Sequence, residues 1–253
     1  AEGRAAYLAQ ASQVIADMKG RLDSLFLVKP QADLVVKAVE PFRAASAGKA
    51  FYEPPAIDGS RPGTYYANLY NMAAMPKYML EALAYHEGIP GHHMQLAIAQ
   101  ELGQLPKFRK FGRHTAYIEG WGLYTELLPK EIGLYQDPYS DFGRLAMELW
   151  RACRLVVDTG LHAKKWSRAQ AISYLEQNTP NAKAEAVNAI DRYIVMPSQA
   201  TAYKIGMIKL IELREKAKTT LGDRFDIREF HDVVLKNGAV PLDTLKQLVD
   251  QYI

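Results

Sequence analysis

The chain has a single cysteine among its 253 residues, at position 153. One thiol excludes an internal disulfide bond and also excludes a zinc site built from several cysteines. Cys153 lies in the helical-looking stretch Leu149–Arg154, which predicts an inert, buried thiol.

Runs of basic residues and long apolar runs are also missing. The net charge of +3 comes from interspersed charges, so we expect no nucleic-acid partner. No stretch is long and apolar enough to cross a bilayer, and no signal peptide is recognisable. The chain begins with Ala1 rather than Met, which we interpret as the mark of a processed or excised piece of a longer protein.

What is present is the composition of an ordinary globular protein, with 49% of the residues hydrophobic and 23% charged, and the pattern of apolar residues predicts a mainly α-helical fold. Apolar residues recur at helical spacing over residues 4–28. Short aromatic and β-branched runs between Pro- and Gly-containing turns predict a small antiparallel sheet over residues 33–70. A helical bundle follows over residues 75–253, with Ser167 and Asp243 as helix N-caps. Without a repeat or linker, we expect one domain over residues 1–253.

Chemistry concentrates in His86–His93, which holds three of the six histidines beside Glu87. Imidazoles and carboxylates are the usual zinc ligands, and a His-Glu pair on a helix is how zinc hydrolases present a ligand and a base together. The run therefore predicts a zinc site rather than three structural histidines.

The spacing of these histidines differs from the four-residue spacing of most helical zinc hydrolases. An unbroken helix would place histidines six or seven positions apart about 9–10 Å from each other along its axis, too far for one ion. Pro90 lacks an N–H and crowds the carbonyl of His86, which favours a bulge or loop-out. Absorbing two residues returns His92 to the second-ligand position, and absorbing three returns His93; we favour His92.

A third ligand must come from elsewhere, and Glu119 follows 27 positions after His92, far enough for a helix to return antiparallel. Gly120 and Gly122 are costly within a helix, about 1 kcal/mol each relative to Ala, and make sense where two helices approach closely around an ion. Glu126, two turns further on, is the second choice.

These residues and several other motifs resemble the C-terminal half of the bacterial family called domain of unknown function 885, whose members are often annotated lipoproteins with a peptidase-like zinc site. The matching motifs are Asp58–Gly63, His86–His93, Glu119–Trp121, Arg154–His162, Pro197–Ala200, Tyr203–Gly206, Phe230-His231 and Gly238–Leu242. Together they span most of residues 1–252.

The resemblance implies a distant similarity to gluzincin peptidases such as thimet oligopeptidase, angiotensin-converting enzyme and the thermostable carboxypeptidases, whose zinc is held by two His and one Glu. We expect His86, His92 and Glu119 to hold Zn²⁺ with one position open for water, which Glu87 deprotonates for attack on a peptide carbonyl. Similarity to the tyrosine of related peptidases makes Tyr203 a candidate oxyanion donor.

His162 is the other candidate donor, with Asp158 one turn before it to fix its tautomer. Arg151, Arg154 and Arg192 are candidates for binding a substrate carboxylate. The segment Gly63–Leu69 is a candidate edge strand for an extended peptide substrate.

Family members are much longer, so the resemblance implies that an N-terminal half of the same protein completes the cleft and that the protein resides outside the cytoplasm, in the periplasm or as a lipoprotein. Two functions compete. The first is a zinc metallopeptidase, and the second is a non-catalytic, envelope-associated or binding module with a degenerate site. A di-iron carboxylate protein would need paired Glu-x-x-His motifs, which the sequence lacks.

Overall fold

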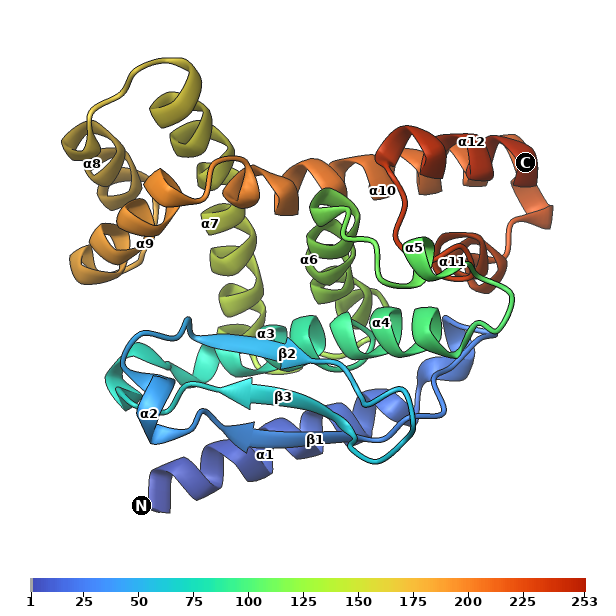
Figure 1. Cartoon of the computed structure of the whole chain (residues 1–253), viewed down its shortest axis with the longest axis horizontal. Helices are drawn as coiled ribbons and strands as arrows, with labels where there is room; N and C mark the ends of the chain where they lie inside the picture. The colour runs from blue at the N-terminus through green and yellow to red at the C-terminus, as the bar shows by residue number, and fades with distance from the viewer. Residues whose placement is uncertain (1) are drawn as a thin grey trace.

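A computed structural model describes residues 2–253, and the fold is mainly helical with one small sheet (Figure 1). The α-helices are α1 (Glu2–Lys19), α2 (Pro41–Ala44), α3 (Leu80–Glu87), α4 (His92–Glu101), α5 (Lys107–Lys110), α6 (Thr115–Glu131), α7 (Pro138–Ala163), α8 (Arg168–Asn178), α9 (Lys183–Val195), α10 (Gln199–Leu221), α11 (Ile227–Leu235) and α12 (Leu242–Tyr252). Short 3₁₀ turns lie at η1 (Leu22–Ser24), η2 (Met72–Ala74), η3 (Lys77–Met79) and η4 (Gly222–Arg224). The strands are β1 (Leu34–Ala38), β2 (Ala50–Glu53) and β3 (Gly63–Ala67).

The sheet is mixed, which corrects the antiparallel sheet expected from the sequence. Its strand order is β1-β3-β2, with β1 parallel and β2 antiparallel to β3. The turn-rich segment 54–62 returns the chain antiparallel from β2 to β3, as its Pro and Gly residues predicted. The connection from β1 passes through α2 and leaves β2 on the far side of β3, so β1 meets β3 in the same direction.

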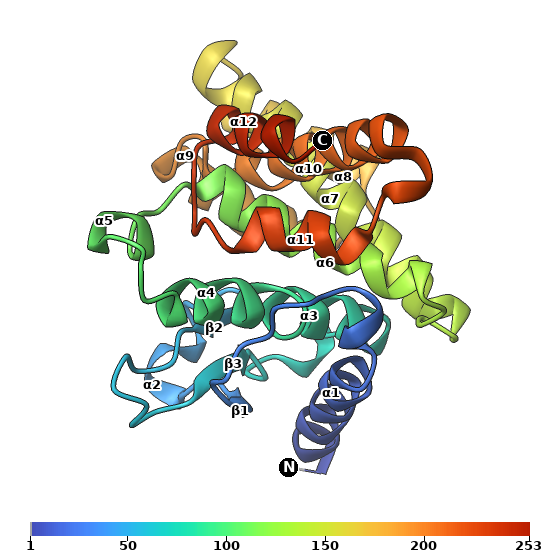
Figure 2. The same ribbon diagram turned by 90° about the vertical axis from the view of Figure 1, so that its right-hand side faces the viewer.

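Two layers of the fold meet at the middle of the molecule (Figure 2). Helices α1, α3 and α4 and the sheet form one layer, and α6, α7 and α10 to α12 form the other. The largest hydrophobic core joins the layers and includes Tyr65, Leu80, Trp121 and Phe230. A second core under α8 and α9 contains the buried Cys153, as the sequence predicted.

Local signals predict some helix ends and miss others. Ser167 caps α8 in a capping box, as predicted. Asp243 lies in the first turn of α12 rather than at its N-cap, which is Pro241, so that prediction was wrong. Helix α1 ends at Lys19 and not near residue 28, because the chain turns at Gly20.

A buried histidine in the main core makes stability depend on pH. The Nδ1–H of His231 donates to the Leu25 carbonyl at 2.8 Å, and its Nε2 accepts from the Tyr124 hydroxyl at 2.9 Å. Burial lowers the pKa of His231 to about 3, so the ring stays neutral in the folded chain. The unfolded chain takes up this proton near the ordinary pKa of about 6.5, and stability is therefore lost as pH falls below that value.

We expect the free energy of unfolding to fall by about 1.6 kcal/mol on this account between pH 6.5 and 5, with a slope that approaches about 1.4 kcal/mol per pH unit at the lower pH. Urea denaturation of the wild type and His231→Gln at several pH values measures the difference. The variant is less stable at neutral pH but has a shallower pH dependence. Equal slopes for the two proteins would show that His231 is protonated in the fold.

Candidate metal centre

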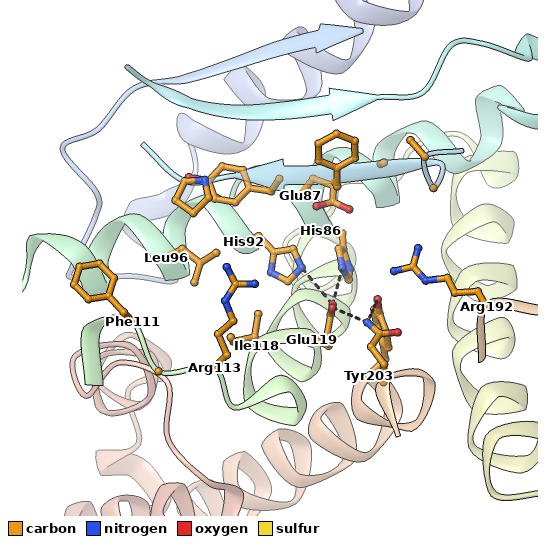
Figure 3. Close-up of a pocket in the computed structure, with 18 of the residues that line it drawn as sticks. His86, Glu87, His92, Leu96, Phe111, Arg113, Ile118, Glu119, Arg192 and Tyr203 are labelled. Atoms are coloured by element: carbon orange, nitrogen blue, oxygen red, sulfur yellow. Dashed lines mark hydrogen bonds and ion pairs between the residues drawn. The ribbon is translucent and has the colours of Figure 1, made fainter. Parts of the chain in front are cut away.

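Three side chains from three helices converge where the two layers meet. His86 lies in the last turn of α3, His92 begins α4, and Glu119 comes from α6 (Figure 3). Glu119 Oε2 lies 3.7 Å from His86 Nε2 and 3.4 Å from His92 Nε2. One ligand atom from each residue lies within 4.8 Å of the other two, so the cluster could hold a metal ion.

The break between α3 and α4 brings the two histidines together. The chain leaves the helix at Gly88 and starts a new one at His92, whereas the sequence suggested a bulge or loop-out that leaves the helix ends in place. A Cβ on Gly91 would lie 1.9 Å from the His86 carbonyl oxygen, so only glycine fits this turn. The indole N–H of Trp121 donates to the Pro90 carbonyl at 3.0 Å and fixes the break against α6.

His93 is directed away from the cluster and has both ring nitrogens occupied. Its Nε2–H donates to the Ala32 carbonyl at 3.0 Å, and its Nδ1 accepts from the Tyr52 hydroxyl at 2.9 Å. Burial lowers its pKa to about 4, which keeps the ring neutral. Its role is to hold β2 and the loop before β1 on α4, so His92 faces Glu119 and His93 does not.

Glu126 supports the cluster from behind rather than facing Glu119. The Nδ1–H of His86 donates to Glu126 Oε1 at 2.8 Å, which directs the Nε2 of His86 toward the cluster. Arg151 Nη2 lies 3.3 Å from the same Glu126 oxygen. Such a carboxylate behind a ligating histidine fixes its tautomer and orientation.

The charges in the cluster reinforce one another. Burial by itself would lower the pKa of His86, but the carboxylates of Glu119 and Glu126 outweigh it and raise the pKa to about 9. Burial would raise the pKa of Glu119, but the two histidines outweigh it and hold that pKa well below its ordinary value. Burial raises the pKa of Glu87, whose side chain is 7% exposed. The carboxylates therefore make this site attractive to a cation.

The two glycines of α6 have different neighbours. A Cβ on Gly122 would lie 2.7 Å from His86 Cε1 and 3.0 Å from His92 Cε1, so Gly122 leaves room for the imidazole rings. A Cβ on Gly120 would lie 2.4 Å from the Cα of Gly206 in α10. The close helix approach expected at these glycines is therefore present, with α10 as the partner of α6.

Helix α10 adds two polar groups to the cluster. The Tyr203 ring lies parallel to the His86 ring, with centroids 6.1 Å apart. The amide nitrogen of Gln199 donates to Glu119 Oε1 at 3.2 Å and to the Tyr203 hydroxyl at 3.0 Å. Burial raises the pKa of Tyr203 to about 12, so its phenol keeps its proton. The sequence analysis did not identify Gln199 as a site residue, although it lies one turn before Tyr203 within the motif Pro197–Ala200.

The structure does not bring His162 to this cluster. Its Nε2–H donates to the Tyr193 carbonyl at 2.9 Å, and its side chain is about one-third exposed. Asp158 lies 3.5 Å from His162 but also accepts from the backbone N–H groups of Ser198 and Thr201. Asp158 therefore caps the N-terminus of α10, and His162 lies outside the metal cluster.

The cluster opens into a cavity of about 710 Å³ that lies along β2. Strand β3, which contains most of Gly63–Leu69, is the central strand and is paired on both sides, so that expected edge strand is wrong. Strand β2 is paired on one side only, and Ala50, Phe51 and Tyr52 line the cavity. Figure 3 shows Arg113 and Arg192 on opposite sides of the cluster.

Comparisons with known proteins place the fold in a family without an assigned function. A family model described as "Bacterial protein of unknown function (DUF885)" matches residues 1–249. A predicted lipoprotein from Colwellia psychrerythraea is 45% identical with a TM-score of 0.97, and the match covers 99% of this chain and 43% of that one. A predicted lipoprotein of unknown function from Shewanella oneidensis is 25% identical with a TM-score of 0.80, covering 96% and 45%. This chain thus spans less than half of either relative, and no curated protein matches it.

Proposed function

The chain belongs to the DUF885 family of bacterial proteins of unknown function, and from this premise we propose that it carries the site of a zinc-dependent peptide hydrolase. The observation that supports the proposal most strongly is the convergence of His86, His92 and Glu119 beside the buried Glu87. Two His and one Glu form the ligand set of gluzincin peptidases, which leaves the fourth position of a zinc ion open.

The residues of the cluster fit a zinc ion. Ligand atoms about 2.0–2.1 Å from a tetrahedral zinc lie about 3.4 Å from one another. The separations of Glu119 Oε2 from the two histidine nitrogens, 3.4 and 3.7 Å, match that value. The buried Nδ1 of His92 has no hydrogen-bond partner within residues 2–253, so that ring is not engaged elsewhere.

A bound zinc ion supplies a Lewis acid that polarises a carbonyl group and lowers the pKa of water. Glu87 accepts the proton of the attacking water and passes it to the leaving amine, and its raised pKa suits both steps. Tyr203 remains protonated and donates a hydrogen bond to the developing oxyanion, while Gln199 holds its hydroxyl oxygen in place.

The free edge of β2 supplies a place for the substrate backbone. An extended peptide that adds to this edge pairs its amide groups with the strand and passes the histidines. Because the solved relatives are more than twice as long as this chain, we expect the rest of the protein to cover the cavity. Their names as lipoproteins favour an extracytoplasmic location, and no helix within residues 2–253 is long and apolar enough to cross a membrane.

Metal content and peptide turnover together test this function. We expect about one zinc ion per chain by mass spectrometry, lost in a folded His86→Ala/His92→Ala variant and retained in His114→Ala, whose exposed histidine lies outside the cluster. Turnover of a set of blocked short peptides should follow the zinc content. Zinc without turnover would favour the non-catalytic binding module, and absence of zinc after reconstitution would contradict the metal site itself.

A further inference from the structure

Arg154 in α7 is a partly buried cation that no ion pair neutralises within residues 2–253. Its Nε is buried and has no hydrogen-bond partner, and within residues 2–253 no carboxylate lies at ion-pair distance from its guanidinium. The neighbouring arginines on the same helix differ, since Arg151 is paired with Glu126 and Arg144 with Asp141. The guanidinium of Arg154 lies over the rings of Tyr193 and Tyr203, at 5.5 and 4.8 Å from their centroids, and these rings carry no net charge, so the guanidinium remains able to bind an anion.

Arg154 lines a second cavity of about 940 Å³ that also reaches His86, Glu87 and Tyr203. Its guanidinium lies 4.8 Å from the centroid of the Tyr203 ring, and the His86 ring stacks on the same tyrosine. Tyr203 is therefore a shared neighbour of the metal cluster and of Arg154. The two separations together place the guanidinium at most about 11 Å from the His86 ring, the length of about three extended residues.

A second free cation lines the same cavity. Arg192 is exposed, has no ion pair within residues 2–253, and points toward His86 and Tyr203 in Figure 3. Of the three carboxylates that line this cavity, Glu87 lies at the metal cluster, whereas Glu185 pairs with Lys49 and Asp191 with Arg168. The part of the cavity beyond Tyr203 is consequently positive.

We infer that Arg154 and Arg192 form a carboxylate subsite, so that the substrate is a short peptide cut within about three residues of a carboxylate group. A C-terminal carboxylate and an Asp or Glu side chain offer the same chemistry. The inference rests on the proposed hydrolase for the position of the cleaved bond, but the subsite itself can be measured by binding alone.

The experiment compares three N-acetylated alanine tetrapeptides by calorimetry on the zinc-loaded Glu87→Gln variant, which prevents turnover. They end in a free carboxylate, in an amide, or in a glutamate residue with an amidated C-terminus. We expect the free acid to bind about 10- to 100-fold more tightly than the amide. If the free acid and the glutamate amide bind equally, the subsite recognises any carboxylate. If the free acid alone binds more tightly than the amide, the subsite recognises the C-terminal carboxylate.

Adding Arg154→Gln should bring the acid-to-amide ratio to within about twofold of one, by weakening the acid and leaving the amide unchanged. Arg154→Lys should restore part of the ratio. Arg113→Gln, on the other side of the cluster, should leave it intact. A structural role of Arg154 would weaken both peptides alike and would overturn the inference. Arg192→Gln gives a second test, at an exposed position where folding is not in question.

The outcomes separate the two proposals. One outcome is that binding depends on the carboxylate and loses this dependence in Arg154→Gln, while the zinc-loaded wild-type chain hydrolyses no peptide. That result would reject the hydrolase and keep the subsite. Hydrolysis of acid and amide at equal rates would keep the hydrolase and reject the subsite. If none of the three peptides binds, that result would also count against the subsite.

Discussion

Glu87→Gln is expected to lower kcat/KM for peptide hydrolysis by about 10²- to 10⁴-fold while the chain still binds its zinc ion. Glu87 is buried beside the two histidines but is not one of the three residues whose ligand atoms converge. The amide keeps the size of the side chain but cannot accept a proton from water at neutral pH, so general-base catalysis is lost. Steady-state kinetics and metal analysis on the same preparations measure both quantities.

Glu126→Gln is the matched control, since it makes the same change to a buried carboxylate on the other side of His86. There we expect zinc affinity to fall by about 10- to 100-fold, and activity to recover at saturating zinc. The opposite pattern, with zinc lost from Glu87→Gln and retained in Glu126→Gln, would make Glu87 a ligand and remove it from the role of base.

Gly206→Ala is expected to destabilise the chain by about 3 kcal/mol or to prevent its folding. A Cβ at this position would lie 1.9 Å from the Ala116 carbonyl oxygen and 2.6 Å from the Gly120 Cα, and backbone atoms cannot rotate away as a side chain does. Helices α6 and α10 would have to separate, and they carry Glu119 and Tyr203.

Gly3→Ala provides the control for the general effect of glycine in a helix. Within residues 2–253, nothing lies within 4 Å of a Cβ at Gly3 in α1, so this variant should be unchanged or more stable by up to about 1 kcal/mol. Thermal and urea unfolding of the two variants and the wild type measure the effect. A Gly206→Ala chain as stable as Gly3→Ala would mean that α6 and α10 are free to separate.

The cluster could be predicted from the sequence because its signal is local. Three histidines, a glutamate, two glycines and a proline within eight residues indicate both a metal site and an irregularity of the helix, predicted as a bulge or loop-out. What the break becomes is not a local property. A new helix at His92, rather than a bulge, depends on contacts with Trp121 of α6 and on the lack of a Cβ at Gly91.

The predictions that differ from the structure share a cause. In each case, contacts with groups far away in the sequence compete with the local pattern. The antiparallel sheet was predicted from turn residues, yet the partner of β1 is set by the crossover through α2. The pair Asp158 and His162 has helical spacing, but the N–H groups at the start of α10 also engage the carboxylate. Tertiary partners decide such cases, and residue spacing does not report them.

The break between the two histidine-bearing helices has a consequence for how such sites are recognised. When both ligands lie on one helix, the rise per residue fixes their separation, and a four-residue spacing identifies the site. Here His86 and His92 are on different helices, so the geometry of the intervening loop sets the distance between the imidazoles. A search for the four-residue spacing would therefore not find this chain. A search for two histidines on either side of a loop rich in Gly and Pro, followed later by Glu-Gly-x-Gly, would find sequences with the same arrangement.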